Sequence, residues 1–325
     1  MSLLGALRRK VGWDAAPRPF PGRDPDGVWR EDAAALPRFE QPDALARVPE
    51  VAARRGLGAQ GEAWLAQWVT EGYFVVEDLY PADLIDRFVA CSEGLWTRAA
   101  PIPGLNISGV VLDGVYRVHV PHAELLALPP AARQAAQAAS DWRVTGFHGA
   151  DPAAAALFRW ANAAKICSAI FDRPAVPRTS LTFAKGSQQS LHQDTAVFHV
   201  WPRNFMAGLW IACEDVAPGA GPLEFYPGSH REPLFPEFDN YPQTQRRTAS
   251  PAQIARYDEY VRGIATRYER KVFLGRKGAG LFWHGMLIHG GAPVTDSAST
   301  RKSFVLHYMP DGADRAGEVH GPFNW

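Results

Sequence analysis

The pattern of hydrophobic and polar positions divides the chain into a helical first half and a strand-rich second half. Between Glu62 and Glu71 the apolar residues recur with helical spacing, and another helix is predicted to begin after Pro81. A third helix is predicted from Pro152 to about Phe171. These segments indicate a helical buttress over residues 61–175 that supports a larger sheet.

Short apolar runs separated by turn residues dominate the chain after Pro177. The predicted strands are Ser180–Ala184, Gln189–Asp194, Phe205–Cys213, Leu223–Tyr226, Lys271–Leu274, Ala279–His284 and Lys302–Tyr308. Many short strands with turns between them are typical of a sandwich or a jelly roll. We therefore expect a mainly β, jelly-roll core over residues 176–310, with flanking helices from the N-terminal half.

Two segments outside this core have patterns of their own. Val110–Leu112 and Val115–Val118 flank Asp113-Gly114, a residue pair that favours a tight hairpin. Residues 1–60 contain repeated prolines and are predicted to form an irregular N-terminal arm. Residues 61–325 are then expected to fold as a single domain.

A long insert, residues 231–270, interrupts the rhythm of strands. It contains a predicted helix with Tyr257, and loops of this length often act as lids. Its aromatic residues Phe235, Phe238 and Tyr241 either line an apolar pocket or anchor the loop on the sheet. The neighbouring Arg246-Arg247 pair either meets a phosphate or carboxylate of a substrate or is solvated.

Composition narrows the classes of partner. Lys plus Arg and Asp plus Glu both number 34, so the net charge is zero and does not favour nucleic acid or an acidic membrane. A small-molecule substrate fits better. Three cysteines without a CxxC pair argue against a structural zinc site or a disulfide scaffold. The chain has no apolar run long enough to span a membrane and no secretory signal, so a cytoplasmic location is expected.

His192 and Asp194 form the first part of a candidate metal site. Two residues apart on a strand, they point to the same face, while Gln193 points away. His289 is the predicted third ligand, and the two glycines after it permit a close approach of the backbone. Two imidazoles and one carboxylate suit Fe(II) and leave positions for a co-substrate and O2. His284 is the nearest alternative to His289.

Arg301 adds a second kind of chemistry. It follows His289 at a distance that a hairpin can close, which is why His289 is preferred over His284. A guanidinium pairs with a carboxylate through two parallel hydrogen bonds, so Arg301 fits the distal carboxylate of a keto diacid. Ser303 faces the same way and offers a hydroxyl. Together they suggest 2-oxoglutarate, although an ordinary strand-end arginine is the alternative.

Four stretches between residues 179 and 309 match a known family in order and spacing. They are Leu191-His192-Gln193-Asp194, Trp210-Ile211-Ala212 leading into Glu214-Asp215, Gly221-Pro222-Leu223 running to Pro227-Gly228-Ser229-His230, and His289-Gly290-Gly291 with Arg301. On these stretches the chain resembles the phytanoyl-CoA dioxygenase (PhyH-like) family of Fe(II)- and 2-oxoglutarate-dependent oxygenases. The resemblance implies a double-stranded β-helix fold.

The same resemblance implies roles for individual residues. His192, Asp194 and His289 would bind iron, and Arg301, Trp210 and Gln193 would contact 2-oxoglutarate. Some members have Ser two residues after the distal histidine, where this chain has Gly291, so any hydroxyl at that contact must come from elsewhere, such as Ser303.

The expected reaction is hydroxylation of a C–H bond with release of succinate and CO2. The family also includes halogenases, in which a small residue replaces the metal carboxylate, but Asp194 is present here. Two alternatives stay open: a cupin-type metal enzyme that does not use 2-oxoglutarate, and a catalytically silent relative that acts as a binding protein. Family members act on chemically diverse substrates, so the family name does not identify the substrate.

Overall fold

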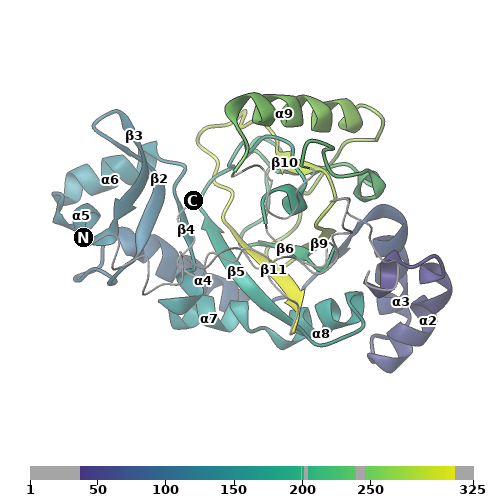
Figure 1. The fold of residues 1–325 in the computed structure, drawn as a ribbon. Coiled ribbons are helices and arrows are strands. Elements are labelled where there is room, and N and C mark those ends of the chain that lie inside the picture. Colours follow the sequence, from purple (N-terminus) through teal and green to yellow (C-terminus); the bar gives the residue numbers. More distant parts are fainter. Residues whose placement is uncertain (1–36, 199, 201–203, 239–245, 247, 312–325) are drawn as a thin grey trace, which may run out of the picture.

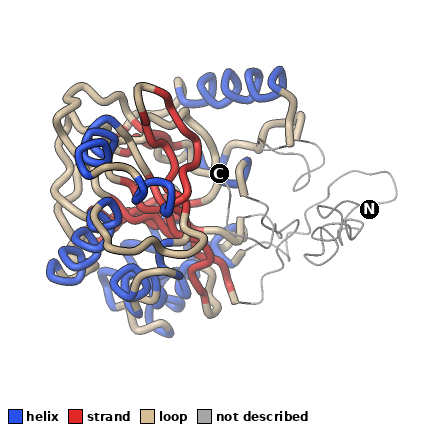
Figure 2. Tube along the Cα trace, turned by 90° about the vertical axis from the view of Figure 1, so that its left-hand side faces the viewer, coloured by secondary structure: helices blue, strands red, loops and turns tan. Residues whose placement is uncertain are grey.

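The fold is described by a computed structural model for residues 37–198, 200, 204–238, 246 and 248–311. Its centre is a pair of antiparallel sheets, and most of the helices cover the outer side of the larger one (Figure 1). Figure 2, turned by 90°, shows the strands gathered in the middle with helices outside them. The mainly β, jelly-roll architecture with flanking helices is therefore confirmed.

Within the described residues, the larger sheet has eight strands, which come from both halves of the chain. In spatial order its strands are β1 (Tyr73–Val76), β9 (Gly280–His284), β6 (Ala207–Ala212), β11 (Ser303–Pro310), β5 (Ala175–Phe183), β4 (Arg143–Thr145), β2 (Asn106–Leu112) and β3 (Val115–Pro121). Strands distant in sequence are neighbours, since β11 pairs with both β5 and β6. The core is thus assembled from both halves of the chain.

The smaller sheet carries one of the predicted metal ligands. Its strands, in order, are β10 (His289–Gly291), β7 (Leu223–Phe225) and β8 (Lys271–Val272). The predicted strand Gln189–Asp194 was wrong: His192 forms only an isolated bridge to His289, and Asp194 begins a short 3-10 helix, η5 (Asp194–Ala196).

Strict alternation along β11 separates the two faces of the larger sheet. Phe304, Leu306 and Tyr308 pack into the cluster that includes the helices. Val305 packs instead with Trp210, in the cluster shared with the smaller sheet. Because successive strand residues point to opposite faces, Ser303, Val305 and His307 turn toward the space between the sheets, and this alternation ends at the register shift between His307 and Tyr308.

Helices precede, flank and interrupt the sheets. They are η2 (Arg38–Glu40), α2 (Ala44–Arg54), α3 (Gly58–Glu71), α4 (Ala82–Glu93), η3 (Gly94–Trp96), α5 (His122–Ala127), α6 (Pro130–Ala139), η4 (Phe147–Gly149), α7 (Pro152–Phe158), α8 (Ala161–Ile170), η6 (Ser229–Arg231) and α9 (Pro251–Ala265). The single helix predicted from Pro152 to Phe171 is two helices.

The predicted irregular arm needs a correction in its described part. Residues 44–54 form α2, in which Val48 and Val51 are buried although Pro49 lies inside the helix. Burial of this apolar stripe outweighs the cost of the proline. Residues 1–36 lie outside the described residues.

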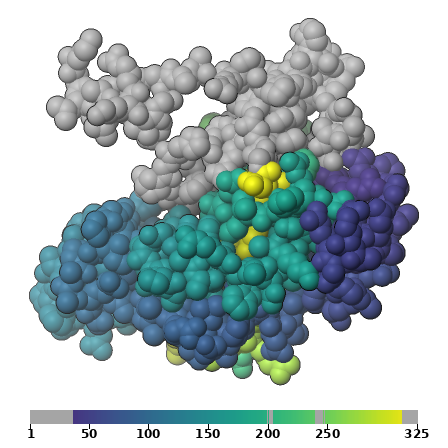
Figure 3. All heavy atoms as spheres, turned by 90° about the horizontal axis from the view of Figure 1, so that it is seen from below, coloured from purple at the N-terminus to yellow at the C-terminus, as the bar shows by residue number. Residues whose placement is uncertain are grey.

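The hairpin and the N-terminal helices lie at opposite ends of the molecule. Asp113 and Gly114 connect β2 to β3 with φ angles of 50° and 77°, which confirms the predicted turn. Figure 3 shows the purple segment of α2 and α3 at one end and the blue hairpin region at the other. The region between these ends positions the candidate site.

Within the insert, the predicted helix is α9. Its start is fixed by a capping box between Ser250 and Gln253. Phe235 and Phe238 pack on Tyr257 of this helix, with ring centroids 5.8 and 5.2 Å away, so these two aromatic residues anchor the loop. Tyr241 lies outside the described residues.

Membrane-spanning helices and paired cysteines are not expected from the sequence, and both points can be examined in the described residues. None of its helices combines the length and the apolar character needed to cross a membrane. The three cysteines are unpaired: Cys167 and Cys213 are buried and Cys91 is half-buried. Burial raises the pKa of the Cys167 thiol well above its ordinary value, so this thiol is a packing group.

Candidate metal centre

The segments that carry the two candidate histidine ligands lie side by side. His192 and His289 exchange two backbone hydrogen bonds, with N–O distances of 2.9 and 3.1 Å. Glycine is required at the next two positions, because a Cβ on Gly290 or Gly291 would lie 2.8 Å from the backbone of Gln189 or Gln188. The predicted close approach is therefore between these two segments.

Three side chains converge at this point. His192, Asp194 and His289 are all buried, and one potential ligand atom from each lies within 4.8 Å of the others. Oδ1 of Asp194 is 3.4 Å from Nε2 of His192 and 3.5 Å from Nε2 of His289. The structure therefore brings the three predicted ligands together. One side of the cluster faces a cavity.

Backbone carbonyls fix the orientation of both imidazoles. Nδ1 of His192 is 2.8 Å from the carbonyl oxygen of Ser190, and Nδ1 of His289 is 2.9 Å from that of Leu287. A carbonyl only accepts, so each Nδ1 donates a proton and each Nε2 keeps its lone pair. The ring nitrogens nearest Asp194 are thereby prepared to bind a cation.

Electrostatics favours the same protonation states. Burial alone would raise the pKa of Asp194, but the surrounding histidines, His289 first and then His192 and His307, hold the pKa of this carboxyl well below its ordinary value. Burial lowers the pKa of His289 to about 4, against the opposing effect of the Asp194 charge. At neutral pH the pair is an ionised carboxylate and a neutral imidazole, as metal binding requires.

The second carboxylate oxygen of Asp194 has its own partners. Nε1 of Trp283 donates a 2.8 Å hydrogen bond to Oδ2, and Nε2 of His307 lies 3.5 Å from the same atom. Thr179 bonds Nδ1 of His307 at 2.7 Å. A Cβ on Gly208 would lie 2.0 Å from the Trp283 ring, so this glycine makes room for the indole. Oδ1 is left as the oxygen that faces both histidines.

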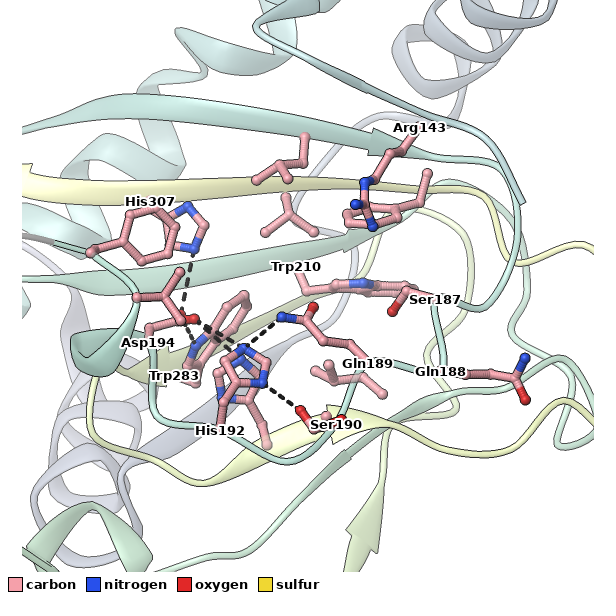
Figure 4. Close-up of a pocket in the computed structure, with 18 of the residues that line it drawn as sticks. Arg143, Ser187, Gln188, Gln189, Ser190, His192, Asp194, Trp210, Trp283 and His307 are labelled. Carbon is pink, nitrogen blue, oxygen red and sulfur yellow. Dashed lines mark hydrogen bonds and ion pairs between the residues drawn. The ribbon is translucent and has the colours of Figure 1, made fainter. Parts of the chain in front are cut away.

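A cavity of about 540 Å³ opens in front of the triad. Figure 4 shows Trp210 between the His192 and Asp194 side and the side where Arg143 enters. Trp210 and Arg301 both line the cavity, and the guanidinium carbon of Arg301 lies 5.4 Å from the Trp210 ring centroid. Two more of the predicted site residues are thus joined to the metal cluster by one space.

Arg301 is a buried cation without an anionic partner among the residues described. It is 2% exposed, and its Nη1 donates a hydrogen bond to the carbonyl of Gly221 at 2.9 Å. Its Nε is buried without an acceptor in this part of the chain. Burial lowers the pKa of Arg301 to about 10, so the group is still charged at neutral pH. A buried charge of this kind calls for an anion.

Two predicted co-substrate residues lie differently from the expectation. Gln193 is not part of the cavity wall; its side-chain amide donates to the carbonyl of Met286 at 3.2 Å. The Oε1 atom of Gln193 is buried without a hydrogen-bond partner among the described residues, and its contact with the co-substrate stays a prediction. Ser303 is fully buried beside the cavity, and its hydroxyl has no partner among the described atoms.

The alternative third ligand, His284, belongs to another cluster. Its Nε2 lies 2.7 Å from a carboxylate oxygen of Glu40, and its ring centroid is 5.3 Å from that of His230. The charge of His284 and its hydrogen bond, opposing the effect of burial, hold the pKa of Glu40 below its ordinary value. His284 therefore ties η2 to β9 and does not join the metal cluster.

Sequence reasoning missed His307, Trp283 and Arg143. His307 is not among the residues predicted for the site, yet it lines the cavity beside Asp194. Its spacing of six residues from Arg301 on a strand would have placed the two on one face. Trp283 and Arg143 gave no comparable signal, because their roles depend on pairing between strands that are distant in sequence.

Comparison with known proteins now identifies the family. The profile described as phytanoyl-CoA dioxygenase (PhyH) matches residues 68–303, well over half of the chain. The chain belongs to this family. The chain is similar to a phytanoyl-CoA dioxygenase domain-containing protein 1 of Danio rerio, with 28% identity over 143 residues, and to a probable phytanoyl-CoA dioxygenase of Caenorhabditis elegans, with 31% identity over 137 residues.

These sequence matches are partial. The first covers 43% of this chain and 44% of the Danio rerio protein, and the second 42% and 40%. The matches therefore span less than half the length of these two relatives.

Solved structures extend the likeness of the fold. The non-heme alpha ketoglutarate dependent carbocyclase SnoK from nogalamycin biosynthesis is 18% identical, with a TM-score of 0.56 over 79% of this chain and 87% of SnoK. EctD from S. alaskensis with bound Fe is 18% identical, with a TM-score of 0.55 over 82% and 81% of the two chains. At these identities the likeness concerns the fold.

Proposed function

We propose that this PhyH family member is an Fe(II)- and 2-oxoglutarate-dependent dioxygenase that hydroxylates a C–H bond of a small-molecule substrate. The observation that carries the proposal is one cavity with a candidate metal-binding triad at one end and, at the other, a buried arginine that has no anionic partner among the described residues. The first feature fits Fe(II), and the second fits the distal carboxylate of 2-oxoglutarate.

The residues present fit both groups. His192, Asp194 and His289 would hold the metal through Nε2, Oδ1 and Nε2, since their other polar atoms are already engaged. Arg301 would bind the distal carboxylate, and Trp210 would shape the space between. Bound ferrous iron supplies the activation of O2, coupled to oxidative decarboxylation of 2-oxoglutarate to succinate and CO2.

The protein contributes order and exclusion of water. Trp283 and His307 hold the Asp194 carboxylate in one orientation, which favours binding through a single oxygen. The insert contributes Arg246 to the cavity wall, and the backbone N–H of Arg246 donates to the carbonyl of Ala196 at 2.9 Å. An insert placed in this way would act as a lid that shields the reacting groups from water.

What is known of SnoK and EctD supports this assignment. SnoK is called alpha ketoglutarate dependent, and EctD of S. alaskensis was crystallised with 2-oxoglutarate and 5-hydroxyectoine. Hydroxylation rather than halogenation is proposed because Asp194 supplies the metal carboxylate. A cupin-type enzyme without 2-oxoglutarate would have no use for the buried charge of Arg301.

Anaerobic titration tests the proposal directly. Apoprotein is titrated with Fe(II) and then with 2-oxoglutarate, while the weak visible charge-transfer band of a keto acid chelated to ferrous iron is recorded. We expect the band in the wild-type protein and its loss in His289→Ala. Iron binding without a band would instead favour a metal enzyme of another type, and failure to bind iron would favour a silent binding protein.

A further inference from the structure

Arg143 is a cation in the cavity that the proposed function does not use. Three arginines line the cavity, and Asp194 is the one carboxylate among its described lining residues. Arg246 is paired with Asp258 at 3.2 Å, and Arg301 is assigned to the co-substrate. Arg143 forms no ion pair with any described residue, and its Nε is buried without an acceptor there.

One molecule of co-substrate brings only two anionic groups into the cavity. One molecule of 2-oxoglutarate has two carboxylates: the one beside the keto group would be used at the metal, and the other would pair with Arg301. Both are then used. Arg143 would then be left half-buried in the cavity wall, with a buried Nε that has no acceptor among the described residues, and an unpaired charge in such a place is costly. A further anion is needed, and the substrate is the remaining occupant.

Strand register places this anion away from the metal. Arg143 pairs with Phe183, and Phe183 pairs with Ser303 on β11. His307, which contacts Asp194, lies four residues farther along β11, or about 13 Å at the usual rise of a strand. Figure 4 shows Arg143 and the His307 and Asp194 pair on opposite sides of the pocket.

The wall between these two sides is apolar. Leu181 on β5 pairs with Val305 on β11. This pair lies two residues nearer to His307 along β11 than the pair of Phe183 and Ser303. Leu181, Val305 and Phe183 line the cavity. A substrate that spans this wall needs an apolar body between its anionic group and the carbon that reacts.

We propose that Arg143 binds an anionic group of the substrate, a carboxylate or a phosphate, and that the substrate is an amphipathic small molecule oxidised several bonds from that group. The inference rests on the proposed function and adds the substrate class to it. A charged hydrogen bond contributes about 1.5 to 3 kcal/mol, which corresponds to about 10- to 100-fold in affinity.

Matched probes test the proposal. Octanoate, octyl phosphate and octan-1-ol share an apolar chain and differ in the end group. Their binding to the protein loaded with Mn(II), which is redox-inert here, and saturating 2-oxoglutarate is measured by calorimetry. We expect one of the anions to bind at least about 10-fold more tightly than octan-1-ol. The better anion of the two identifies the end group.

Variants assign the preference to Arg143. Arg143→Met should remove the preference for the anion, and Arg143→Lys should retain part of it, because the charge remains while the planar fork is lost. Arg117→Met removes an exposed arginine from β3 of the same sheet and should have no effect. Melting temperatures of all variants show whether they are folded.

Orientation gives an independent readout. Paramagnetic Mn(II) broadens the NMR signals of nearby ligand protons, so the terminal methyl group should broaden more than the CH2 next to the anion. The reverse order would overturn the placement of the anion at Arg143.

Two further results would contradict the inference. One is equal binding of octan-1-ol and the anions, or binding of none of them. The other is a loss of 2-oxoglutarate affinity in Arg143→Met as large as in Arg301→Met, which would assign Arg143 to the co-substrate. A wild-type protein that binds no 2-oxoglutarate contradicts the proposed function instead, so the two failures are distinguishable.

Discussion

The two ends of the cavity differ in how completely their polar groups are satisfied. At the metal end, the imidazole Nδ1 atoms donate to backbone carbonyls, and both oxygens of Asp194 have nearby partners. At the arginine end, Nε of Arg301, Nε of Arg143 and the hydroxyl of Ser303 are buried without partners among the described residues. The metal end is organised before its ligand binds, whereas the arginine end is completed by its ligands.

This difference predicts opposite effects of mutation on stability. Polar groups that are satisfied within the protein stabilise the fold, so their removal should cost stability as well as function. Unpaired buried cations destabilise the apoprotein, so their removal should cost function alone. Four substitutions test this contrast.

The largest effect is expected for a metal ligand. His289→Ala should lower Fe(II) affinity by more than about 100-fold, beyond the loss typical of a residue that only supports a ligand. His119→Ala removes an exposed histidine of β3 and serves as the control for nonspecific metal binding. Calorimetric titration under anaerobic conditions measures both. Equal affinities in the two variants would contradict the ligand assignment.

Arg301→Met separates stability from binding. The variant should weaken 2-oxoglutarate binding by about 100-fold, since a charged hydrogen-bonding group is lost. Its apoprotein should be more stable than the wild type by about 1 to 3 kcal/mol, because a buried cation without an anion is replaced by an apolar side chain. Urea unfolding with and without 2-oxoglutarate gives both values. A destabilised apoprotein would show that Arg301 is already satisfied.

A smaller effect is expected for the indole that holds Asp194. Trp283→Phe keeps the ring and removes the 2.8 Å hydrogen bond to Oδ2, and we expect about 10-fold weaker metal binding. Trp160→Phe removes a hydrogen bond of the same length to the carbonyl of Leu79. Trp160 is not part of the cavity wall, so this variant should leave metal affinity unchanged. The same loss in both variants would point to a general loss of stability.

The smallest effect is expected for Ser303→Ala. Its hydroxyl has no partner in the described region, so the free energy of unfolding should change by less than about 0.5 kcal/mol. If this hydroxyl meets the co-substrate, 2-oxoglutarate affinity should fall by less than about 10-fold. Thermal unfolding and the charge-transfer titration provide these two numbers. A large loss of stability would place the hydroxyl in an internal hydrogen bond.

How far the sequence predicted this molecule depends on whether the signal is local. The Asp113-Gly114 turn, the helix around Tyr257 and the strand-rich second half follow from spacing and turn residues, and they were confirmed. The strand assigned to residues 189–194 was wrong. Local alternation resembled a strand, but Asp194 starts a 3-10 helix against Gly285.

The candidate site shows the same limit. His192, Asp194 and His289 were found because their residue types and order are specific, and the structure brings them together. Trp283 and Arg143 reach the cavity only through strand pairings, which no local pattern encodes. The side-chain amide of Gln193, implied by the family resemblance as a co-substrate contact, donates to the carbonyl of Met286, so this role also depends on contacts that no local pattern encodes.

Discrimination between two keto acids tests the central claim most directly, namely that both ends of the cavity bind one co-substrate molecule. Pyruvate has the keto acid group of 2-oxoglutarate and lacks the distal carboxylate. Charge-transfer titration of the Fe(II) protein should show about 100-fold tighter binding of 2-oxoglutarate than of pyruvate, and Arg301→Met should abolish this ratio by weakening 2-oxoglutarate alone. Equal affinities in the wild type, or an unchanged ratio in the variant, would contradict the account.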